Sequence, residues 1–361
     1  MTKDADPGLA RLDIDLSAIA ANWHTLVARH PGGPVAGVLK ADAYGLGAAQ
    51  VAPALHAVGC RHFFTAHLAE AIAIRPMLSG AMLAVLNGLP PGSEAAFVAH
   101  DILPVLGTPD EIARWSALGA RLGRRLPALL HIDTGMNRLG LDPAALAGIA
   151  GRLDGIALRY VMTHLAAAEV ADDPMNARQR ARFAAACAAL PGVARSLANS
   201  SGIFLGAEYG SDLARPGAAL YGINPTPGRP NPMRPVVRLR ARVLALRDVP
   251  AGEGVGYNST WVAPRPSRIA TVGVGYADGW LRSHSGRGHA NFDAARLPLV
   301  GRVSMDLTTF DVTDAPGLGA GDWLELIGPG RSADDVADAA GTNGYEVLTS
   351  LGRRYRRVWR A

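Results

Sequence analysis

Short apolar runs alternate with longer amphipathic segments over roughly the first 235 residues. The amphipathic segments are Ala-rich and have helical spacing; examples are 16–28, behind a capping Asp15, 109–118 and 176–190. Repeated strand–helix units of this kind predict a parallel sheet. The expected strands are 35–39, 62–66, 82–86, 102–106, 126–133, 157–163 and 196–198.

Seven or eight such units in about 235 residues fit a closed barrel better than an open sheet. A doubly wound sheet is the alternative, but no GxGxxG fingerprint follows an early strand. We therefore expect an α/β protein with an N-terminal (β/α)8 TIM-like barrel.

The pattern changes after Asn231 and Pro232. Strand-like runs then follow one another, with Gly, Pro and Asp turns between them, and indicate a mostly antiparallel β-domain. We interpret the Pro-rich stretch TPGRPNPMRP at 226–235 as the linker between the two domains. We expect a barrel domain of residues 1–230 and a β-domain of residues 231–361. The predicted strands of the β-domain are 236–249, 267–275, 296–303, 306–313 and 323–327.

Composition excludes several classes of protein. Hydrophobic residues make up 49% of the 361 residues, which is enough for sizeable cores. The formal charge of +5 comes from arginines that are scattered except for the tail RRYRR at 353–357. Without a basic stripe, we expect no nucleic-acid partner. Cys60 and Cys187 form neither a disulfide framework nor a metal site. The N-terminus lacks the apolar run of a signal peptide and no stretch is long enough to span a membrane, so we expect a cytoplasmic protein without a membrane partner.

Lys40 is the first candidate for chemistry. Barrel enzymes place catalytic groups at the C-terminal ends of strands, and Lys40 follows the run 35–39 directly. Burial there would lower the lysine pKa and make the amine nucleophilic. The alternative is a lysine at the barrel rim that extends its ammonium to solvent. Tyr44, four residues on, could donate its hydroxyl to a phosphate.

Other polar groups follow other predicted strands at equivalent positions. A Ser-Ser-Gly turn among them could offer backbone N–H groups to a phosphate. Each is also compatible with a structural role, and their convergence on one rim favours a site. They are His131, Asp133, Thr134 and Arg138, then His164, then Asn199, Ser200, Ser201 and Gly202, and finally Arg215.

A series of motifs in these regions resembles the ordered signatures of the alanine racemase family, from residue 11 to about 357. The resemblance implies a barrel with a C-terminal β-domain, bound pyridoxal 5′-phosphate (PLP), and a head-to-tail homodimer with shared active sites. The motifs are VLKADAYGLG, HIDTGMNRLG, MTHLAAAE, LANSSG, ARPGAALYG, GEGVGYNSTW, VGYADGW and VGRVSMD.

The resemblance also implies roles for individual residues. Lys40 would be the Schiff-base lysine, and Tyr257 the opposing catalytic base, supplied to the partner subunit. Arg215 would face the pyridine nitrogen of PLP, with His164 beside the ring. The other cofactor-binding residues would be Tyr44, Asn199, Ser200, Gly217 and Ala218. The substrate-binding residues would be Arg138, Met305 and Asp306 at the substrate carboxylate, Tyr276 at the gate and Arg302 at the entrance.

The implied reaction is interconversion of L-alanine and D-alanine, which supplies D-alanine for peptidoglycan. Two bases on opposite faces of the substrate can remove and return the α-proton without moving. Lys40 would serve the D-substrate and Tyr257 the L-substrate. An arginine at the ring nitrogen would leave that nitrogen unprotonated and so limit side reactions.

Some positions depart from the family pattern. His131 stands where many relatives carry a carbamylated lysine that orients the arginine matching Arg138, and we expect a neutral His131 whose pKa the neighbouring cation reduces. Asn137 replaces a common glycine. The phosphate-binding tyrosine of many relatives aligns with Arg353, two residues before Tyr355.

Three other functions stay open. A racemase of broader specificity, for serine or a basic amino acid, would share this build. A PLP-dependent decarboxylase on the same barrel would not need Tyr257 or Arg215 in these roles. A non-catalytic PLP carrier would not need the C-terminal β-domain.

Overall fold

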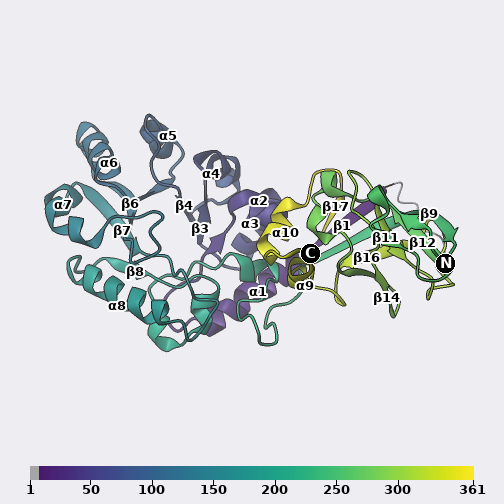
Figure 1. Ribbon diagram of the computed structural model, residues 1–361. Helices are drawn as coiled ribbons and strands as arrows, with labels where there is room; N and C mark the ends of the chain where they lie inside the picture. The colour runs from purple at the N-terminus through teal and green to yellow at the C-terminus, as the bar shows by residue number, and fades with distance from the viewer. Residues whose placement is uncertain (1–7) are drawn as a thin grey trace. The chain divides into compact units, whose positions relative to one another are not determined.

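The computed structural model describes residues 8–361, which form two compact units (Figure 1). The barrel unit is Ile19–Arg234, and the β-unit combines the chain up to Ala18 with Pro235–Ala361. The expected lack of a signal peptide concerns in part residues 1–7, which lie outside the described residues. Among residues 8–361, no helix has the length and apolar character needed to cross a membrane.

Seven parallel strands follow one another in chain order around the barrel unit. The segment 213–216 completes the ring. On one side the Ala214 N–H donates to the Pro34 carbonyl (3.0 Å) and the Ala36 N–H to the Ala214 carbonyl (2.8 Å). On the other side the Leu213 N–H donates to the Arg195 carbonyl (3.2 Å). The predicted barrel is thus confirmed, with strands β2 (Gly37–Val38), β3 (His62–Thr65), β4 (Met82–Val85), β5 (Leu103–Leu106), β6 (Leu126–His131), β7 (Ile156–Met162) and β8 (Ala194–Ser196).

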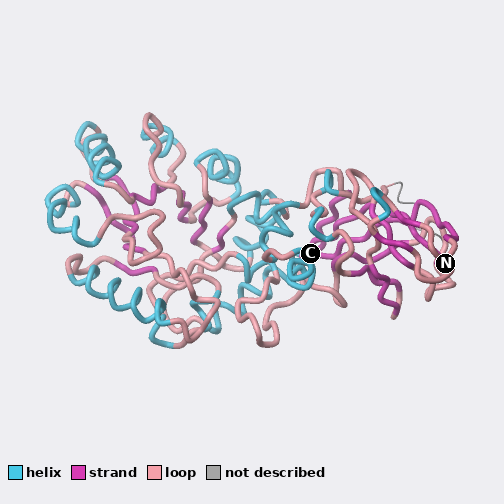
Figure 2. Tube along the Cα trace, viewed as in Figure 1, coloured by secondary structure: helices cyan, strands magenta, loops and turns pink. Residues whose placement is uncertain are grey.

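Helices lie outside this ring of strands (Figure 2). Their starts are encoded locally: before α6 the Thr108 hydroxyl accepts from the Glu111 N–H (3.2 Å), and the Glu111 carboxylate accepts from the Thr108 N–H (3.0 Å). The helices of this part of the chain are α1 (Leu16–Arg29), α2 (Lys40–Gly45), α3 (Ala48–Ala57), α4 (Leu68–Ile74), α5 (Glu94–Ala99), α6 (Pro109–Arg121), α7 (Leu146–Leu153) and α8 (Pro174–Ala188).

A continuous apolar cluster is built from the barrel strands and the segment that closes the ring. Because these side chains exclude water, polar groups gather in the segments that follow the strands. The buried members of the cluster are Ala36, Val38, Phe64, Ala84, Leu103, Val105, Leu129, Met162 and Leu213.

The β-unit is built on a mostly antiparallel sheet in the order β14-β13-β16-β9-β1-β17, with β12 pairing with β9 and β15. Its strands are β1 (Ala10–Asp15), β9 (Val237–Val249), β12 (Ser267–Val272), β13 (His289–Phe292), β14 (Ala295–Pro298), β15 (Thr308–Asp311), β16 (Trp323–Ile327) and β17 (Arg356–Arg360). A separate two-stranded ribbon pairs β10 (Gly254–Val255) with β11 (Trp261–Val262), and the helices are α9 (Ala333–Ala340) and α10 (Gly344–Ser350).

The first strand differs from the sequence-based division, which placed residues 1–230 together. Strand β1 pairs antiparallel with β9 and parallel with β17. The Asp13 carboxylate of β1 accepts hydrogen bonds from Arg240 of β9 (3.1 Å) and Arg360 of β17 (2.8 Å). Residues 10–15 therefore belong structurally to the β-unit.

Candidate active site

Lys40 begins an unusual turn after β2. The next four residues, Ala41 to Tyr44, all have left-handed backbone conformation, with φ between 53° and 55°. The turn is closed by the Ala43 N–H, which donates to the Leu39 carbonyl (2.8 Å), and by the Ala48 N–H, which donates to the Asp42 carboxylate (2.7 Å). Left-handed conformation costs each non-glycine residue roughly 1–2 kcal/mol, so the surrounding structure holds this turn under strain.

Glu70 of α4 fixes the same turn from outside. One carboxylate oxygen accepts from the Ala41 N–H (2.6 Å), and the other accepts from the N–H groups of Ala66 and His67 (both 2.9 Å). The segments after β2 and β3 are thereby joined next to Lys40. Burial lowers the pKa of the Lys40 ammonium, the Arg138 cation lowers it further, and Glu70 opposes them.

Arg215 is a buried cation held by neutral acceptors. Its side chain, from the segment that closes the barrel, donates to the Ser196 hydroxyl and to the Thr163 carbonyl. Within residues 8–361 no carboxylate forms an ion pair with it. Burial lowers the Arg215 pKa to about 9, so the side chain is still protonated at neutral pH.

The two histidines at the ends of β6 and β7 are neutral. Burial, followed by the charges of Arg215 and Arg138, lowers the pKa of His164 to about 3. Burial and Arg215 also lower the pKa of His131 to about 4, although Asp133 opposes the shift. The expected reduction at His131 is confirmed, but its largest cause is burial rather than the neighbouring cation.

A small cradle forms where three loops meet. The Ser200 hydroxyl accepts from the N–H groups of Gly217 (3.1 Å) and Ala219 (3.2 Å). A Cβ atom at Gly217 would collide with the Tyr44 hydroxyl, so only glycine allows this approach. Tyr44 stacks on Tyr221, with 4.8 Å between the ring centroids. Ser200, Gly217 and Tyr44 are thus brought together as predicted from the sequence, with Ala218 next along the chain and Asn199 just before Ser200.

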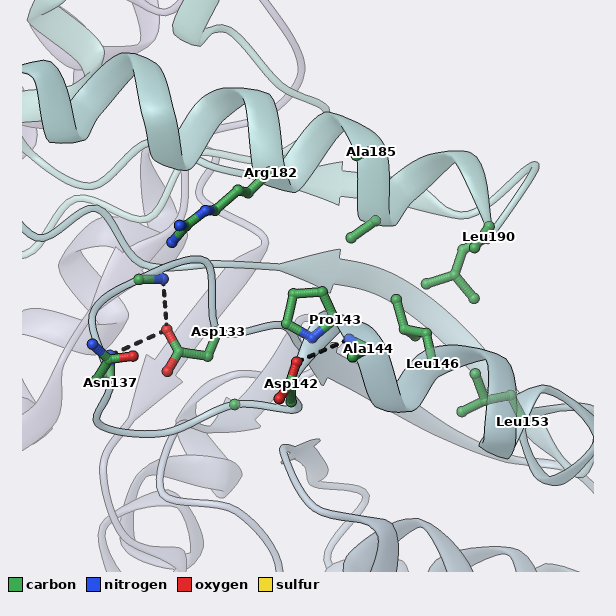
Figure 3. Close-up of a pocket in the computed structure, with 14 residues that line it drawn as sticks. Asp133, Asn137, Asp142, Pro143, Ala144, Leu146, Leu153, Arg182, Ala185 and Leu190 are labelled. Carbon is green, nitrogen blue, oxygen red and sulfur yellow. Dashed lines mark hydrogen bonds between the residues drawn. The ribbon is translucent and has the colours of Figure 1, made fainter.

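Arg138 lies on a loop after β6 that a single carboxylate organises (Figure 3). Asp133 accepts from the N–H groups of Gly135 (2.8 Å), Met136 (2.9 Å) and Asn137 (3.2 Å). Asn137, where relatives often have glycine, has a φ of 55°, a conformation that asparagine tolerates. Arg138 is exposed, and among the described residues no hydrogen bond joins it to His131.

The same loop borders a cavity of about 820 Å³ between α7 and α8 (Figure 3). Leu146, Leu153 and Leu190 line its apolar part and Arg182 its polar end. Lys40 does not line it. This cavity is therefore distinct from the group of predicted cofactor-binding residues.

In the β-unit, the predicted residues gather on adjoining loops. The N–H groups of Tyr276 and Ala277 donate to the carbonyls of Ser304 (3.0 Å) and Met305 (2.9 Å). A Cβ atom at Gly256 would lie 3.6 Å from the backbone N of Arg302, so the turn of Tyr257 lies beside that residue. Tyr257, Tyr276 and Met305 have exposed fractions of 68%, 42% and 54%.

Asp306 belongs to an ion-pair network on the same surface. Arg354 donates to the Asp306 carboxylate (2.8 Å) and to both oxygens of the buried Asp278 (2.6 and 2.9 Å). Of the two candidates for the missing phosphate-binding tyrosine, Arg353 is exposed. Tyr355 is buried, and its hydroxyl has no hydrogen-bond partner among the described residues.

Comparison with known proteins identifies the family. Residues 14–225 match the family model of the alanine racemase N-terminal domain, and residues 236–359 match that of the C-terminal domain. An alanine racemase of Acidiphilium cryptum is 58% identical over 350 residues, which cover 96% of this chain and 98% of that protein. The chain belongs to the alanine racemase family.

Solved structures of alanine racemases have the same fold. The enzyme of Bartonella henselae, crystallised with covalently bound pyridoxal phosphate, superposes with a TM-score of 0.95 at 40% identity, covering 98% of this chain and all of that one. The biosynthetic alanine racemase of Pseudomonas aeruginosa has a TM-score of 0.91 at 34% identity, with the same coverage. The chain thus belongs to a family of isomerases.

The sequence analysis did not predict three residues of this chain that hold the candidate site residues in place by hydrogen bonds. Glu70 accepts a hydrogen bond from the turn of Lys40, and Ser196 accepts one from Arg215. Gln179 donates to Thr134 in the loop after β6 and to His164 in the loop after β7. One signal was available: α8 buries Asn176 and Gln179 on the same face as Phe183. Polar residues at helical spacing on an apolar face indicate buried hydrogen bonds.

Proposed function

We propose that this chain binds PLP covalently through Lys40 and interconverts L-alanine and D-alanine. The observation that carries the proposal is the arrangement of the strand ends. At these strand ends lie a lysine with a lowered pKa and a buried arginine with which no carboxylate of residues 8–361 forms an ion pair. Family membership and the PLP-containing relative from Bartonella henselae support the same assignment.

The residues present fit the cofactor. The cradle of Tyr44, Ser200 and Gly217, with Asn199 and Ala218 beside it, can hold the phosphate, because the glycine lets the Tyr44 hydroxyl come close to the backbone that bonds to Ser200. PLP supplies an electron sink that acidifies the α-proton of a bound amino acid. Arg215 remains protonated and can donate to a ring nitrogen without giving up its proton.

The protein's own groups then bind the substrate and move its proton. Arg138 binds the substrate carboxylate, together with Met305 and Asp306 of the partner subunit. The Lys40 amine, neutral more readily because burial lowers its pKa, accepts the α-proton of D-alanine on one face. On the other face the partner subunit's Tyr257 accepts the α-proton of L-alanine.

The remaining groups control the surroundings of the cofactor ring and the access of substrate to the site. Neutral His164 would lie beside the pyridine ring of PLP, where it could accept a hydrogen bond. Tyr276 and Arg302 of the β-unit line the approach to the substrate. In this proposal the enzyme is a head-to-tail homodimer of the cytoplasm that supplies D-alanine for peptidoglycan and has no nucleic-acid or membrane partner.

Two measurements test the assignment of the bases. Borohydride reduction followed by peptide mapping should place the pyridoxyl group on Lys40. Tyr257→Phe should keep PLP but lower racemisation by roughly 10²–10⁴-fold, the usual contribution of a general base. Solvent deuterium should then enter D-alanine far faster than L-alanine.

The control is Tyr345→Phe, which removes a hydroxyl from α10 of the same β-unit and should leave the rate unchanged. A pyridoxyl group on another lysine would remove Lys40 from this role. Equal loss of exchange from both enantiomers would remove the face assignment. A panel that includes serine and basic amino acids measures the breadth of substrate.

A further inference from the structure

Gln179 of α8 is a fully buried amide that joins two catalytic loops. Its side-chain oxygen accepts from the Ala166 N–H (2.8 Å). Its side-chain nitrogen donates to the His164 carbonyl (2.9 Å) and to the Thr134 hydroxyl (3.2 Å). One side chain thus fastens the loop after β6 to the loop after β7, with no part of it exposed to solvent.

The bond to Thr134 continues inward. The hydroxyls of Thr134 and Thr163 are 2.8 Å apart and hydrogen-bonded, and both residues are buried. The Thr163 carbonyl in turn accepts from the Arg215 guanidinium. A chain of hydrogen bonds therefore runs from α8 through the two threonines to the buried cation.

Because buried amides and hydroxyls are costly to leave unpaired, such a fully satisfied network has few alternative arrangements. It fixes the backbone at His164 and, through Thr163, the direction of the Arg215 side chain. The same helix also holds the loop that carries Arg138, because Arg182 donates to the Thr134 carbonyl (3.2 Å).

We propose that Gln179 is a positioning residue for His164 and Arg215 and so sets the catalytic rate rather than substrate affinity. The inference rests on the proposed function, because it concerns groups that would face the cofactor. Gln179 itself lies behind the loops, so it acts through the residues that it holds.

Asn176 provides a matched control on the same helix, one turn earlier. It is equally buried, and its amide nitrogen donates to the carbonyls of Val170 (2.9 Å) and Ala167 (3.3 Å). It therefore fastens the later part of the loop after β7, away from the strand ends. Gln179→Met and Asn176→Leu each replace a buried amide with an apolar side chain of similar size.

For the PLP-loaded enzyme, we expect Gln179→Met to lower kcat at least tenfold, to change KM less than threefold, and to shift the pH midpoint of the visible PLP absorbance. Asn176→Leu should change none of these values. At pH 6, Gln179→Glu should have a higher kcat than Gln179→Met, when each is expressed as a fraction of the parent enzyme's kcat. At pH 8.5 it should not. A buried carboxyl is protonated more readily and can then donate to the His164 carbonyl.

The apoprotein gives a readout that does not need the cofactor. In its ¹⁵N NMR spectrum, the ring signals of His164 should move in Gln179→Met and stay in place in Asn176→Leu. Equal effects of both variants on kcat and on His164, or no effect of Gln179→Met, would overturn the proposal. Failure of the proposed function would look different, since the unmodified chain itself would lack PLP bound to Lys40 or racemase activity.

Discussion

The groups that follow the barrel strands carry an excess of positive charge. Lys40, Arg138 and Arg215 lie close enough to shift the pKa of His164, and that histidine and His131 are neutral. Among the described residues, two carboxylates oppose the lowering of pKa values at this site. Glu70 raises the pKa of Lys40, and Asp133 raises that of His131. Such a site favours anionic ligands, and the phosphate of PLP and the carboxylate of an amino acid are both anions.

The depressed pKa of His131 links folding to pH. Its pKa is about 4 in the folded protein and 6.5 for an unperturbed side chain, so the unfolded chain takes up the proton first. Stability should therefore fall as the pH decreases from about 6.5 towards 4, by up to about 1.4 kcal/mol per unit for this one group. His131→Asn should make the fall shallower, because the asparagine side chain does not titrate. Urea unfolding at pH 7, 6 and 5 measures the difference.

Other buried histidines contribute to the absolute slope, so the comparison with His131→Asn isolates this one. His24→Asn is a control, since His24 lies exposed on α1. Equal slopes for His131→Asn and the parent protein would mean that His131 takes up its proton in the folded state. A direct hydrogen bond from Arg138 is not needed for the neutral ring, because burial has the larger effect.

For single residues, the sequence predicted which side chains lie at strand ends better than it predicted their hydrogen-bond partners. The position of Lys40 at a strand end could be predicted because it follows an apolar run directly, although that position alone also fitted a lysine at the barrel rim. The partners of Arg215 could not, because Ser196 and Thr163 are nineteen and fifty-two positions away along the chain. Only the folded sheet brings their oxygens to the guanidinium.

Among the elements, the turn after β2 is the most strained. Ala41 has a φ of 53° and an exposed side chain, so its methyl group adds strain without packing against the core. Ala41→Gly should raise the free energy of unfolding of the apoprotein by up to about 1 kcal/mol, because glycine adopts this conformation without penalty. Part of the gain is offset by the greater freedom of glycine in the unfolded chain.

The exposed Ala117 in the middle of α6 provides the opposite case. Ala117→Gly should lower the free energy of unfolding by about 1 kcal/mol, the usual helix penalty. Denaturant unfolding of both variants measures the two signs. If Ala41→Gly destabilised the protein as much as Ala117→Gly, Ala41 would not have a left-handed backbone conformation.

Apolar runs predicted most of the strands, since seven barrel strands and several β-unit strands lie within one or two residues of the expected ranges. Several elements were not predicted, among them β13 and β17, and for two others the physical reason is clear. The short apolar run before Arg215 was too brief to be predicted as a strand, and hydrogen bonds to neighbouring backbone hold the segment 213–216 in place. Strand β1 precedes a helix, like a barrel strand, but its Asp13 binds arginines of β9 and β17.

For the whole molecule, the important fact is that the predicted site residues are divided between two units. Lys40, His164 and Arg215 belong to the barrel unit, whereas Tyr257 and Met305 belong to the β-unit and are largely exposed. A head-to-tail homodimer would complete each site with the β-unit of the other chain. Each site would then take its lysine from one chain and its tyrosine from the other.

Mixing two inactive variants tests this arrangement. A Lys40→Ala chain lacks one base in its barrel unit, and a Tyr257→Phe chain lacks the other in its β-unit. In a heterodimer of the two, one site lacks both bases and the other has both. Random exchange gives about half heterodimers, so activity should recover to about a quarter of that of the unmodified enzyme. Mixing Lys40→Ala with Lys40→Arg should recover none, because every site then lacks the lysine. If tagged heterodimers of the first pair are isolated and remain inactive, each site is built from a single chain.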